Sequence, residues 1–308
     1  MTFAVLFPGQ GNQHPHMLPW LESEPASATV VATMTRMLGE DWRERARDEH
    51  WLNSNEVAQV LVTGTSLAAW AELAPRLPGP PAIVAGYSVG ELAAFAGAGV
   101  FDPQQALELA VRRAEEMDRC VEGLSTGLLS VSGTSEAVLI QTCTGLHLEC
   151  AIRVANDHGI YAGEDATLRQ ARGRLSHVGA KCKRLPVRVA SHSSWMHRAA
   201  SAFAHELQSV RFNPAQCPVA LNASGTTTRH AAMLRAALSR QIDSTVQWSA
   251  CMKSIAERRV SCVIEVGSGS ALSRMWSTHH PEVPVRAVED FRDPRAISRW
   301  VAHHCERA

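Results

Sequence analysis

A serine flanked by two glycines is the strongest chemical signal in this sequence. Ser88 lies in Gly86-Tyr87-Ser88-Val89-Gly90, after an apolar run at 82–87 and before a helical pattern. A G-x-S-x-G pentapeptide in that context is typical of a nucleophile elbow, a strained turn that lifts the serine hydroxyl above a sheet. The helix N-terminus that follows adds partial positive charge, which favours a developing oxyanion. The pentapeptide alone also fits a plain strand-to-helix turn, so the context is what favours a nucleophile.

A nucleophilic serine needs a base, and the chain offers 14 histidines. Spacing alone does not choose among them, because catalytic partners meet in space and not in sequence. His192 is a candidate since it directly follows the strand-like run 185–189. Two neighbouring arginines, Arg112 and Arg113, lie in a helical segment, where either one also fits a solvated helix residue.

The elements that would position these residues alternate between strands and helices. Apolar runs at 3–7, 82–87 and 262–266 each end in a glycine-containing turn, and helical periodicity covers 103–120 and 198–210. Such alternation predicts an α/β fold whose parallel sheet carries its functional loops at the carboxyl ends of the strands.

Residues 125–190 differ in texture from the rest of the chain. Short strand-like runs at 128–131, 153–155 and 185–189 alternate with helical patterns at 134–143 and 164–180. We therefore predict a hydrolase-like parallel-sheet large domain, residues 1–124 and 191–308, with an inserted small ferredoxin-like α+β subdomain, residues 125–190.

Composition narrows the classes of function. Thirty basic and 30 acidic residues give a formal net charge of zero, so no overall field would attract nucleic acid or an anionic membrane. The apolar run 3–7 is too short for a signal peptide, and we expect no membrane span and a cytoplasmic location. The 8 cysteines form no C-x-x-C pair, so we expect reduced thiols and no metal site.

Several separated stretches together resemble a known family. The sequence is similar to the acyltransferase family typified by malonyl-CoA:acyl carrier protein transacylases and the acyltransferase domains of polyketide and fatty acid synthases. The stretches that carry the resemblance occur in the family's order: Phe7-Pro8-Gly9-Gln10-Gly11-Asn12-Gln13, Gly86-Tyr87-Ser88-Val89-Gly90-Glu91, Arg113 with Met117, Ser191-His192, Val246-Gln247-Trp248 and Glu265-Val266-Gly267-Ser268-Gly269.

The resemblance implies a role for six residues. Ser88 would form an acyl ester and His192 would act as its general base. An oxygen of Gln247 would orient His192, and the backbone N–H groups of Gln10 and Val89 would form the oxyanion hole. Arg113 would hold the free carboxylate of a malonyl group through two hydrogen bonds, which would exclude acetyl groups. No cofactor or metal is implied; the partners are a coenzyme A thioester and an acyl carrier protein with a phosphopantetheine-type arm.

Departures from the family pattern bear on the pathway and the substrate. Tyr87 replaces the histidine that usually precedes the nucleophile, and Ser191 before His192 leaves a methylmalonyl group open beside malonyl. The elbow and the tail Val288-Glu289-Asp290-Phe291-Arg292 look most like the epsilon subunit of malonate decarboxylase, which malonylates a dedicated carrier. The alternatives are the malonyl transacylase of fatty acid or polyketide synthesis, a serine hydrolase of similar fold, and a non-catalytic scaffold.

A carrier protein is normally acidic, so a basic face near the site would suit docking. Four basic residues of the small subdomain are candidates: Lys181, Lys183, Arg184 and Arg188. A solvated basic stretch without a partner fits them equally well.

Overall fold

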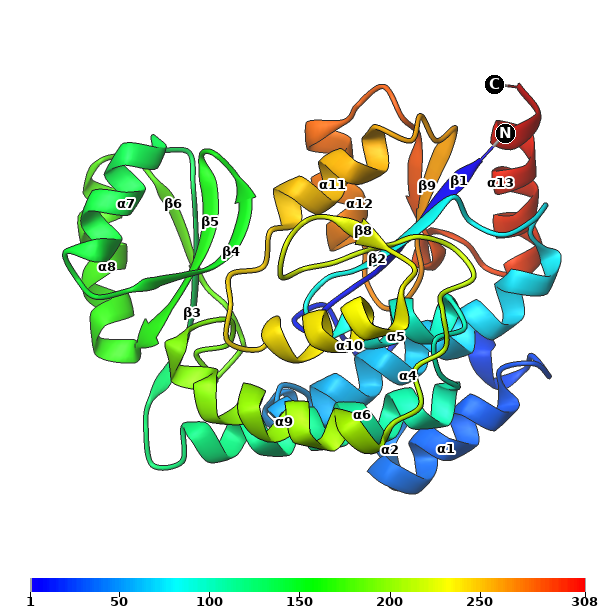
Figure 1. The fold of residues 1–308 in the computed structure, drawn as a ribbon, viewed down its shortest axis with the longest axis horizontal. Helices are drawn as coiled ribbons and strands as arrows, with labels where there is room; N and C mark the ends of the chain where they lie inside the picture. The colour runs from blue at the N-terminus through cyan, green and yellow to red at the C-terminus, as the bar shows by residue number, and fades with distance from the viewer. Residues whose placement is uncertain (1, 308) are drawn as a thin grey trace.

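A computed structural model describes residues 2–307 of the chain. Figure 1 shows a large lobe that contains both ends of the described chain and a small lobe, drawn in green, beside it. The large lobe is built around a six-stranded sheet in the order β10-β9-β1-β2-β7-β8. Its strands are β1 (Phe3–Phe7), β2 (Ile83–Gly86), β7 (Val219–Ala220), β8 (Thr227–Thr228), β9 (Cys262–Glu265) and β10 (Val285–Ala287).

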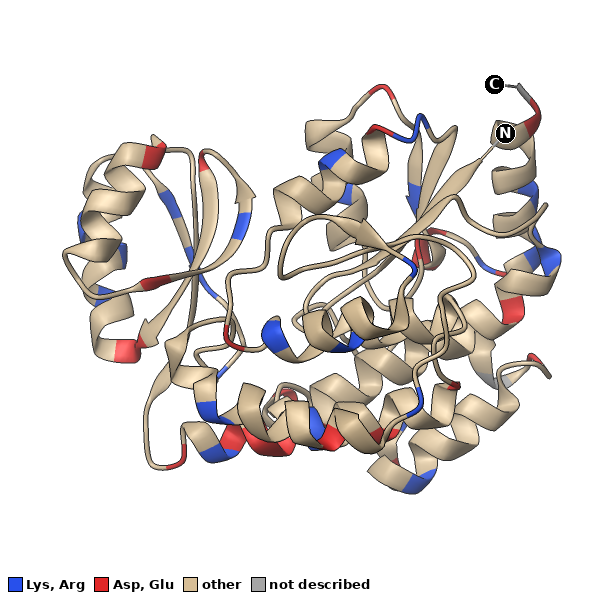
Figure 2. Cartoon of the chain, in the orientation of Figure 1, with Lys and Arg blue, Asp and Glu red and all other residues tan. Residues whose placement is uncertain are grey.

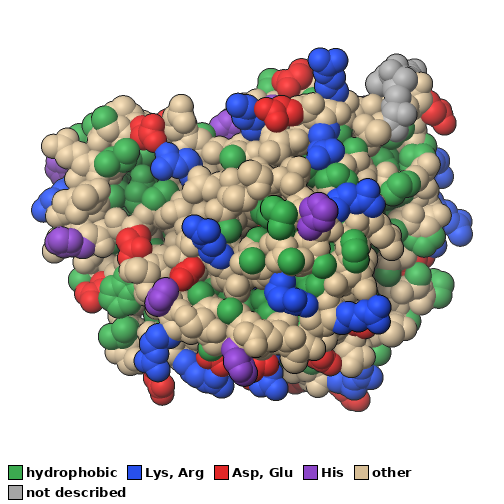
Figure 3. Space-filling model, viewed as in Figure 1, with side chains coloured by type: hydrophobic (Ala, Val, Ile, Leu, Met, Phe, Trp, Pro, Cys, Tyr) green, Lys and Arg blue, Asp and Glu red, His purple; other side chains and the backbone are tan. Residues whose placement is uncertain are grey.

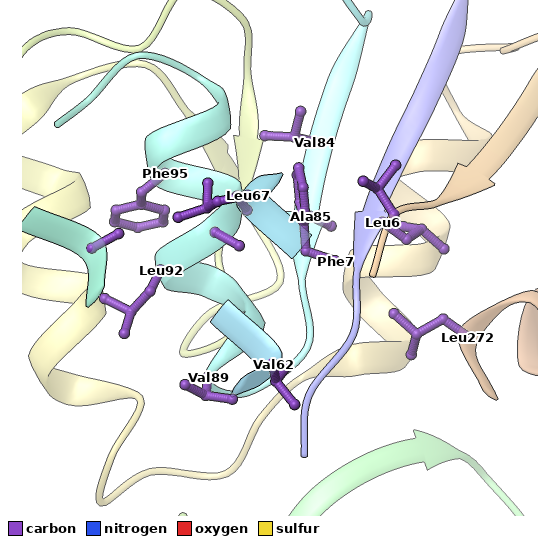
Figure 4. Packing of buried hydrophobic residues seen from close by; sticks show 14 of the residues in the cluster. Leu6, Phe7, Val62, Leu67, Val84, Ala85, Val89, Leu92, Phe95 and Leu272 are labelled. Atoms are coloured by element: carbon purple, nitrogen blue, oxygen red, sulfur yellow. The ribbon is translucent and has the colours of Figure 1, made fainter. Parts of the chain in front are cut away.

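The core of the large sheet is parallel. Strand β1 pairs in parallel with β2 on one side and β9 on the other, and only β8 at the edge is antiparallel. Every residue of β1, β2 and β9 is buried, which explains why these strands read as continuous apolar runs and not as alternating patterns. Figure 4 shows Leu6, Phe7 and Ala85 of adjacent strands packed among side chains of the neighbouring helices.

Helices cover both faces of this sheet. Figure 1 shows α12 and α13 on opposite sides of β9, and both helices contact it. The helices of the large lobe are α1 (Ala28–Leu38), α2 (Trp42–Arg45), α3 (Glu49–Leu52), α4 (Asn55–Leu73), α5 (Gly90–Gly97), α6 (Pro103–Cys120), α9 (His197–Ser209), α10 (Ala231–Arg240), α11 (Trp248–Ala256), α12 (Ala271–His279) and α13 (Pro294–Arg307). Short 3₁₀ turns are η1 (Pro19–Glu22), η2 (Ala74–Arg76), η3 (Ser194–Met196) and η4 (Val288–Asp290).

Helix α4 is longer and more apolar than the sequence analysis allowed. Among the described residues, the segment Asn55–Arg76 is the one that could cross a membrane by length and composition, and 83% of its most apolar stretch is buried inside the fold. It packs against α1, α5 and α6. A helix that is apolar all round and covered by other helices is the expected core helix of a large domain.

The small lobe is a four-stranded antiparallel sheet in the order β4-β5-β3-β6. Its elements are β3 (Thr126–Ser132), α7 (Glu136–Thr144), β4 (Glu149–Ala155), β5 (His158–Glu164), α8 (Asp165–His177) and β6 (Lys181–Arg184). Helices α7 and α8 contact each other, and α8 packs on β3, β5 and β6. This βαββαβ order is ferredoxin-like, so the predicted α/β fold with a small α+β sheet is confirmed.

One predicted strand is wrong. Residues 185–189 are irregular, and the last strand of the small sheet is β6, directly before them. Arg184 explains the difference, because its guanidinium donates to the carbonyl oxygens of Leu185 and Val187 and so occupies groups that a strand would need for pairing. Residues 185–189 instead form an irregular connection from β6 back to the large lobe.

Most charged side chains lie on the outside of the two lobes; among the described side chains, the buried exceptions are Glu72, Glu91, Arg113 and Glu265. Figure 2 shows the central strands β1 and β2 without charges, and Figure 3 shows basic and acidic groups interspersed on the visible face. The absence of a single-sign surface on this face agrees with the formal net charge of zero.

Candidate active site

Ser88 lies in a strained turn between β2 and α5. Its φ is 55°, a left-handed value that is uncommon for a residue with a side chain. The turn is held tightly on both sides: a Cβ on Gly86 would lie 2.1 Å from the backbone of Gly90, and a Cβ on Gly90 would lie 2.4 Å from the carbonyl oxygen of Phe7. Only glycine fits at these positions, so the predicted nucleophile elbow has a direct steric cause.

His192 is the histidine that meets Ser88. Its Nε2 lies 2.7 Å from Ser88 Oγ, and both residues are buried. Its Nδ1 lies 2.5 Å from the backbone carbonyl oxygen of Gln241. Because a carbonyl can only accept, Nδ1 carries the proton and Nε2 presents a lone pair to the serine hydroxyl. The arrangement suits proton abstraction from Ser88.

The electrostatics of the site keep His192 neutral. Burial lowers its pKa to about 3, the positive charge of Arg113 acts in the same direction, and the hydrogen bond to the Gln241 carbonyl opposes both. A neutral imidazole is the form that can accept a proton, so the base is ready across the physiological range.

Gln247 does not orient His192, and that prediction is wrong. The Gln247 amide lies 3.4 Å from the carbonyl of Thr245, and its segment is tied to the small sheet through a bridge between Ile152 and Val246. The orienting group is the backbone carbonyl of Gln241, at the end of α10. The last carbonyls of a helix lack partners within the helix, so this oxygen is free to accept from an outside donor.

Gln10 and Val89 come together although they lie far apart in the sequence. Phe7 of β1 pairs with Gly86 of β2, so the loop after β1 lies beside the elbow. No hydrogen bond within the described chain uses the backbone N–H of either Gln10 or Val89. Two free donors beside a nucleophile are what an oxyanion hole requires.

Arg113 is buried in the fold, whereas Arg112 is exposed. Arg113 is 1% exposed, and its two terminal nitrogens donate to the side-chain oxygens of Gln59 at 2.7 Å and Gln241 at 2.9 Å. Arg112 pairs on the surface with Glu115. Burial lowers the pKa of Arg113 to about 10, against the charge of Glu91, so it is a cation at neutral pH. The structure therefore separates two arginines that the sequence left equivalent.

A small cavity of about 40 Å³ opens at Ser88. Its wall is aliphatic on the side of the small lobe and of the connecting segment, and polar on the side of the elbow. The lining residues are Gln10, Tyr87, Ser88, Leu128, Ile152, Ile160, Leu185, Val187, Ser191 and His192. Tyr87 packs edge-on against Trp248 with ring centroids 5.0 Å apart, so it forms part of the cavity wall and is not a base. Ser191 also lines this wall, next to His192.

Four buried polar residues of the site escaped the sequence analysis: Gln59, Glu91, Asn222 and Gln241. Asn222 accepts from the backbone N–H of Ser88 at 2.8 Å and donates to the carbonyl of Gly86 at 2.6 Å. It follows β7, which pairs with β2, so a polar residue just after a short strand was the available signal. Glutamines and glutamates inside helical patterns gave no such signal.

We found no group of three His, Cys, Asp or Glu side chains arranged to hold a metal ion among residues 2–307.

Comparison with known proteins identifies the family. Residues 4–298 match the acyl transferase domain family. The chain is 30% identical over 295 residues to the malonyl CoA-acyl carrier protein transacylase of Mycobacterium tuberculosis, covering 94% of this chain and 97% of the relative. It is 30% identical over 306 residues to that of Salmonella typhimurium, covering 96% and 97%.

Solved structures agree with this match. A malonyl-transacylase in complex with its type II PKS acyl-carrier protein superimposes with a TM-score of 0.89 at 27% identity, covering 97% of this chain and 99% of the other. The transacylase structure from Mycobacterium tuberculosis gives a TM-score of 0.87 at 28% identity, covering 97% and 100%. The fold, the Ser88–His192 pair and these matches lead to one conclusion: this chain belongs to the acyl transferase domain family and is an acyltransferase.

Proposed function

We propose that this chain is a malonyl-CoA:acyl carrier protein malonyltransferase that works through an acyl-serine intermediate. The observation that carries the malonyl assignment is Arg113. Its guanidinium is buried, no carboxylate of residues 2–307 lies within 4.0 Å of it, and its Nε has no hydrogen-bond partner there. A buried cation without an anion is costly, and a substrate carboxylate would supply the missing partner.

The mechanism uses the Ser88–His192 pair twice. Ser88 Oγ attacks the thioester carbonyl as His192 Nε2 takes its proton, and the N–H groups of Gln10 and Val89 stabilise the oxyanion. The intermediate collapses to the malonyl ester, and His192 returns the proton to the departing coenzyme A thiolate. In the second half, His192 deprotonates the carrier thiol, which attacks the ester; the proton then returns to Ser88.

An open groove outside the cavity offers a route for the carrier arm. The groove has a volume of about 780 Å³ and shares Leu185 and Val187 with the cavity wall. Lys181 and Lys183 on β6 are exposed, and Arg188, also exposed, donates to His50 at the rim of the groove. We propose these three basic residues for carrier docking.

Arg184 is a less suitable docking residue than the sequence analysis assumed. It pairs with Asp165 at 2.7 Å and donates to four backbone carbonyls, those of Thr126, Leu128, Leu185 and Val187. Its guanidinium therefore holds the connecting segment in place. Charge reversal at Lys181 and Lys183 should raise the KM for the carrier without changing the rate of Ser88 acylation.

Three carriers are candidates for the pathway: those of fatty acid synthesis, of polyketide synthesis and of malonate decarboxylase. The relatives found are named malonyl CoA-acyl carrier protein transacylases, which favours the carrier of fatty acid synthesis. Tyr87 and the tail at 288–292 favour the malonate decarboxylase carrier as the second candidate. We also propose a cytoplasmic location, where coenzyme A thioesters and carrier proteins would be available.

The test is an acylation and chase experiment. The protein is incubated with radiolabelled malonyl-CoA or acetyl-CoA, as wild type, Ser88→Ala, Arg113→Met and Arg112→Met. We expect malonyl label that requires Ser88, is lost selectively in Arg113→Met, and is retained in the exposed control Arg112→Met. A chase with each carrier then identifies the acceptor. Label released only to water, or equal acetyl and malonyl labelling, would refute the proposal.

A further inference from the structure

Glu91 is a fully buried carboxylate beside the elbow that the acyl-transfer steps do not use. It lies in the first turn of α5, three residues after Ser88. Its Oε1 accepts from the backbone N–H of Asn222 at 2.6 Å, and its Oε2 accepts from the side-chain amide of Gln241 at 3.1 Å. No lysine or arginine of the described residues forms an ion pair with it. Burying an acid at such a cost calls for a positioning role.

The two residues that Glu91 binds hold Ser88 from both sides. Asn222 bonds the backbone N–H of Ser88, and the amide of Gln241 donates to the carbonyl oxygen of Ser88 at 2.8 Å. The left-handed backbone of Ser88 is therefore held by two side chains, and Glu91 accepts from the backbone N–H of one of these residues and from the amide of the other. Strained backbone of this kind persists only where the surroundings hold it.

Gln241 also connects Glu91 with Arg113. Its side-chain oxygen accepts from Arg113, its side-chain nitrogen donates to Glu91, and its backbone carbonyl accepts from His192. A guanidinium can only donate and a carboxylate can only accept, so the amide has one allowed orientation. One residue thus fixes the cation, the base and the nucleophile relative to one another.

We propose that Glu91 is a positioning residue that aligns Arg113 with the Ser88–His192 pair through the side-chain amide of Gln241, and that selectivity for a carboxylate-bearing acyl group depends on this alignment. The inference rests on the proposed role of Arg113 as the carboxylate clamp. It extends that role to a residue that touches neither substrate nor reacting atoms.

The substitution Glu91→Gln tests whether Glu91 fixes the orientation of the Gln241 amide. A glutamine at 91 presents an NH₂ group where two donors, from Asn222 and Gln241, already point. If the Gln241 amide turns over to relieve the conflict, its own NH₂ faces Arg113, and the guanidinium keeps only Gln59 as an acceptor. Removing the negative charge alone would strengthen the hold of Arg113 on an anion, so a fall in malonyl selectivity can arise only from lost alignment.

The experiment compares acylation by malonyl-CoA and acetyl-CoA in wild type, Glu91→Gln, Gln241→Met and Glu72→Gln. Assays are run at about pH 9, because burial raises the pKa of Glu91 to about 8. Gln241→Met keeps the backbone carbonyl on His192 and removes the side-chain amide, with its hydrogen bonds to Arg113, Glu91 and the Ser88 carbonyl. Glu72 is a matched control, because it is equally buried and accepts from Ser27 N but has no contact with Gln241.

We expect Glu91→Gln and Gln241→Met each to lower the malonyl-to-acetyl ratio of kcat/KM by about 10- to 100-fold, as for a misaligned reactant. The malonyl-to-acetyl ratio of the double variant should be only slightly lower than that of either single variant, since both substitutions break the same link between Glu91 and Arg113. Glu72→Gln should change the free energy of unfolding without changing the ratio. Should Glu91→Gln fail to fold, an unchanged ratio in Gln241→Met would still overturn the proposal, because the link from Glu91 to Arg113 passes through this amide.

The outcomes separate this inference from the proposed function. A wild-type enzyme without malonyl preference would overturn the proposed function and the inference together. A wild-type preference that needs Arg113 but survives in both Glu91→Gln and Gln241→Met would overturn the inference alone. Equal losses of kcat/KM with malonyl-CoA and acetyl-CoA would show that Glu91 has only a structural role and would refute the proposal.

Discussion

Replacing Asn222 with alanine should weaken both the fold and the nucleophile. The side chain is fully buried and makes two hydrogen bonds to the elbow, to Ser88 N–H at 2.8 Å and to the Gly86 carbonyl at 2.6 Å. Asn222→Ala leaves both backbone groups buried without partners. Each such orphaned group costs about 1–3 kcal/mol, so the free energy of unfolding should fall by about 2–6 kcal/mol.

Ser88 should also lose its left-handed backbone geometry in this variant. A displaced Oγ no longer lies 2.7 Å from His192 Nε2, and we expect the rate of acylation to fall by about 10- to 100-fold. Urea unfolding measures the first effect and single-turnover labelling with malonyl-CoA the second.

Asn213→Ala is the matched control for Asn222→Ala. Asn213 makes one longer side-chain hydrogen bond, 3.3 Å to the Val100 carbonyl, outside the site. Asn213→Ala should lower the free energy of unfolding by less than about 1 kcal/mol and leave the acylation rate unchanged. If Asn222→Ala behaved like Asn213→Ala in both assays, the elbow would not depend on this side chain and our account of its strain would be wrong.

Three further predictions follow from the same geometry. Gly90→Ala places a Cβ 2.4 Å from the Phe7 carbonyl oxygen, so it should separate the two oxyanion donors and lower the acylation rate about 100-fold without loss of malonyl selectivity. His192 binds a proton less readily in the fold, where its pKa is about 3, than in the unfolded chain, near 6.5, so its contribution to stability is full above pH 6.5 and is lost as the pH falls towards 3. The free energy of unfolding of His192→Gln should therefore vary less across this pH window than that of the wild type, by about 5 kcal/mol, and an unchanged pH dependence would contradict the assignment. Arg184→Met should lower the free energy of unfolding by about 2 kcal/mol through loss of the Asp165 pair and of the carbonyl contacts, with no change in a carrier KM measured at low temperature.

The parts of the site that follow strands were accessible from the sequence. Ser88 and the loop containing Gln10 both end apolar runs, and parallel strands bring such ends to one edge of the sheet. His192 was one candidate among 14 histidines from its position after a strand-like run, and the family resemblance was needed to select it. Arg113 differs from Arg112 in the face of α6 that it occupies. It lies four residues from both Leu109 and Met117, on the buried apolar face, so the helical periodicity carried a signal for its burial that the sequence analysis did not use.

The partner of His192 could not be found by residue type at all. The acceptor is a backbone carbonyl, and every residue carries one. Gln241 supplies it because α10 ends there, and the exact last residue of a helix is the least predictable feature of a sequence pattern. Gln247 was predicted from its place in the stretch Val246-Gln247-Trp248 that resembles the family. The register of residues 245–247 is instead set by pairing with the small sheet, a contact between distant segments.

The charge of Arg113 explains why the group that accepts a hydrogen bond from His192 is neutral. A carboxylate in the place of the Gln241 carbonyl would lie close to the buried guanidinium and would pair with it. Arg113 would then have its anion before substrate arrived, and the carboxylate of a malonyl group would gain little from binding there. The nearest acid, Glu91, is held away from Arg113 by the amide of Gln241, which accepts from one and donates to the other. In the proposed mechanism the base is thus oriented without a charge, and the cation stays available for a substrate carboxylate.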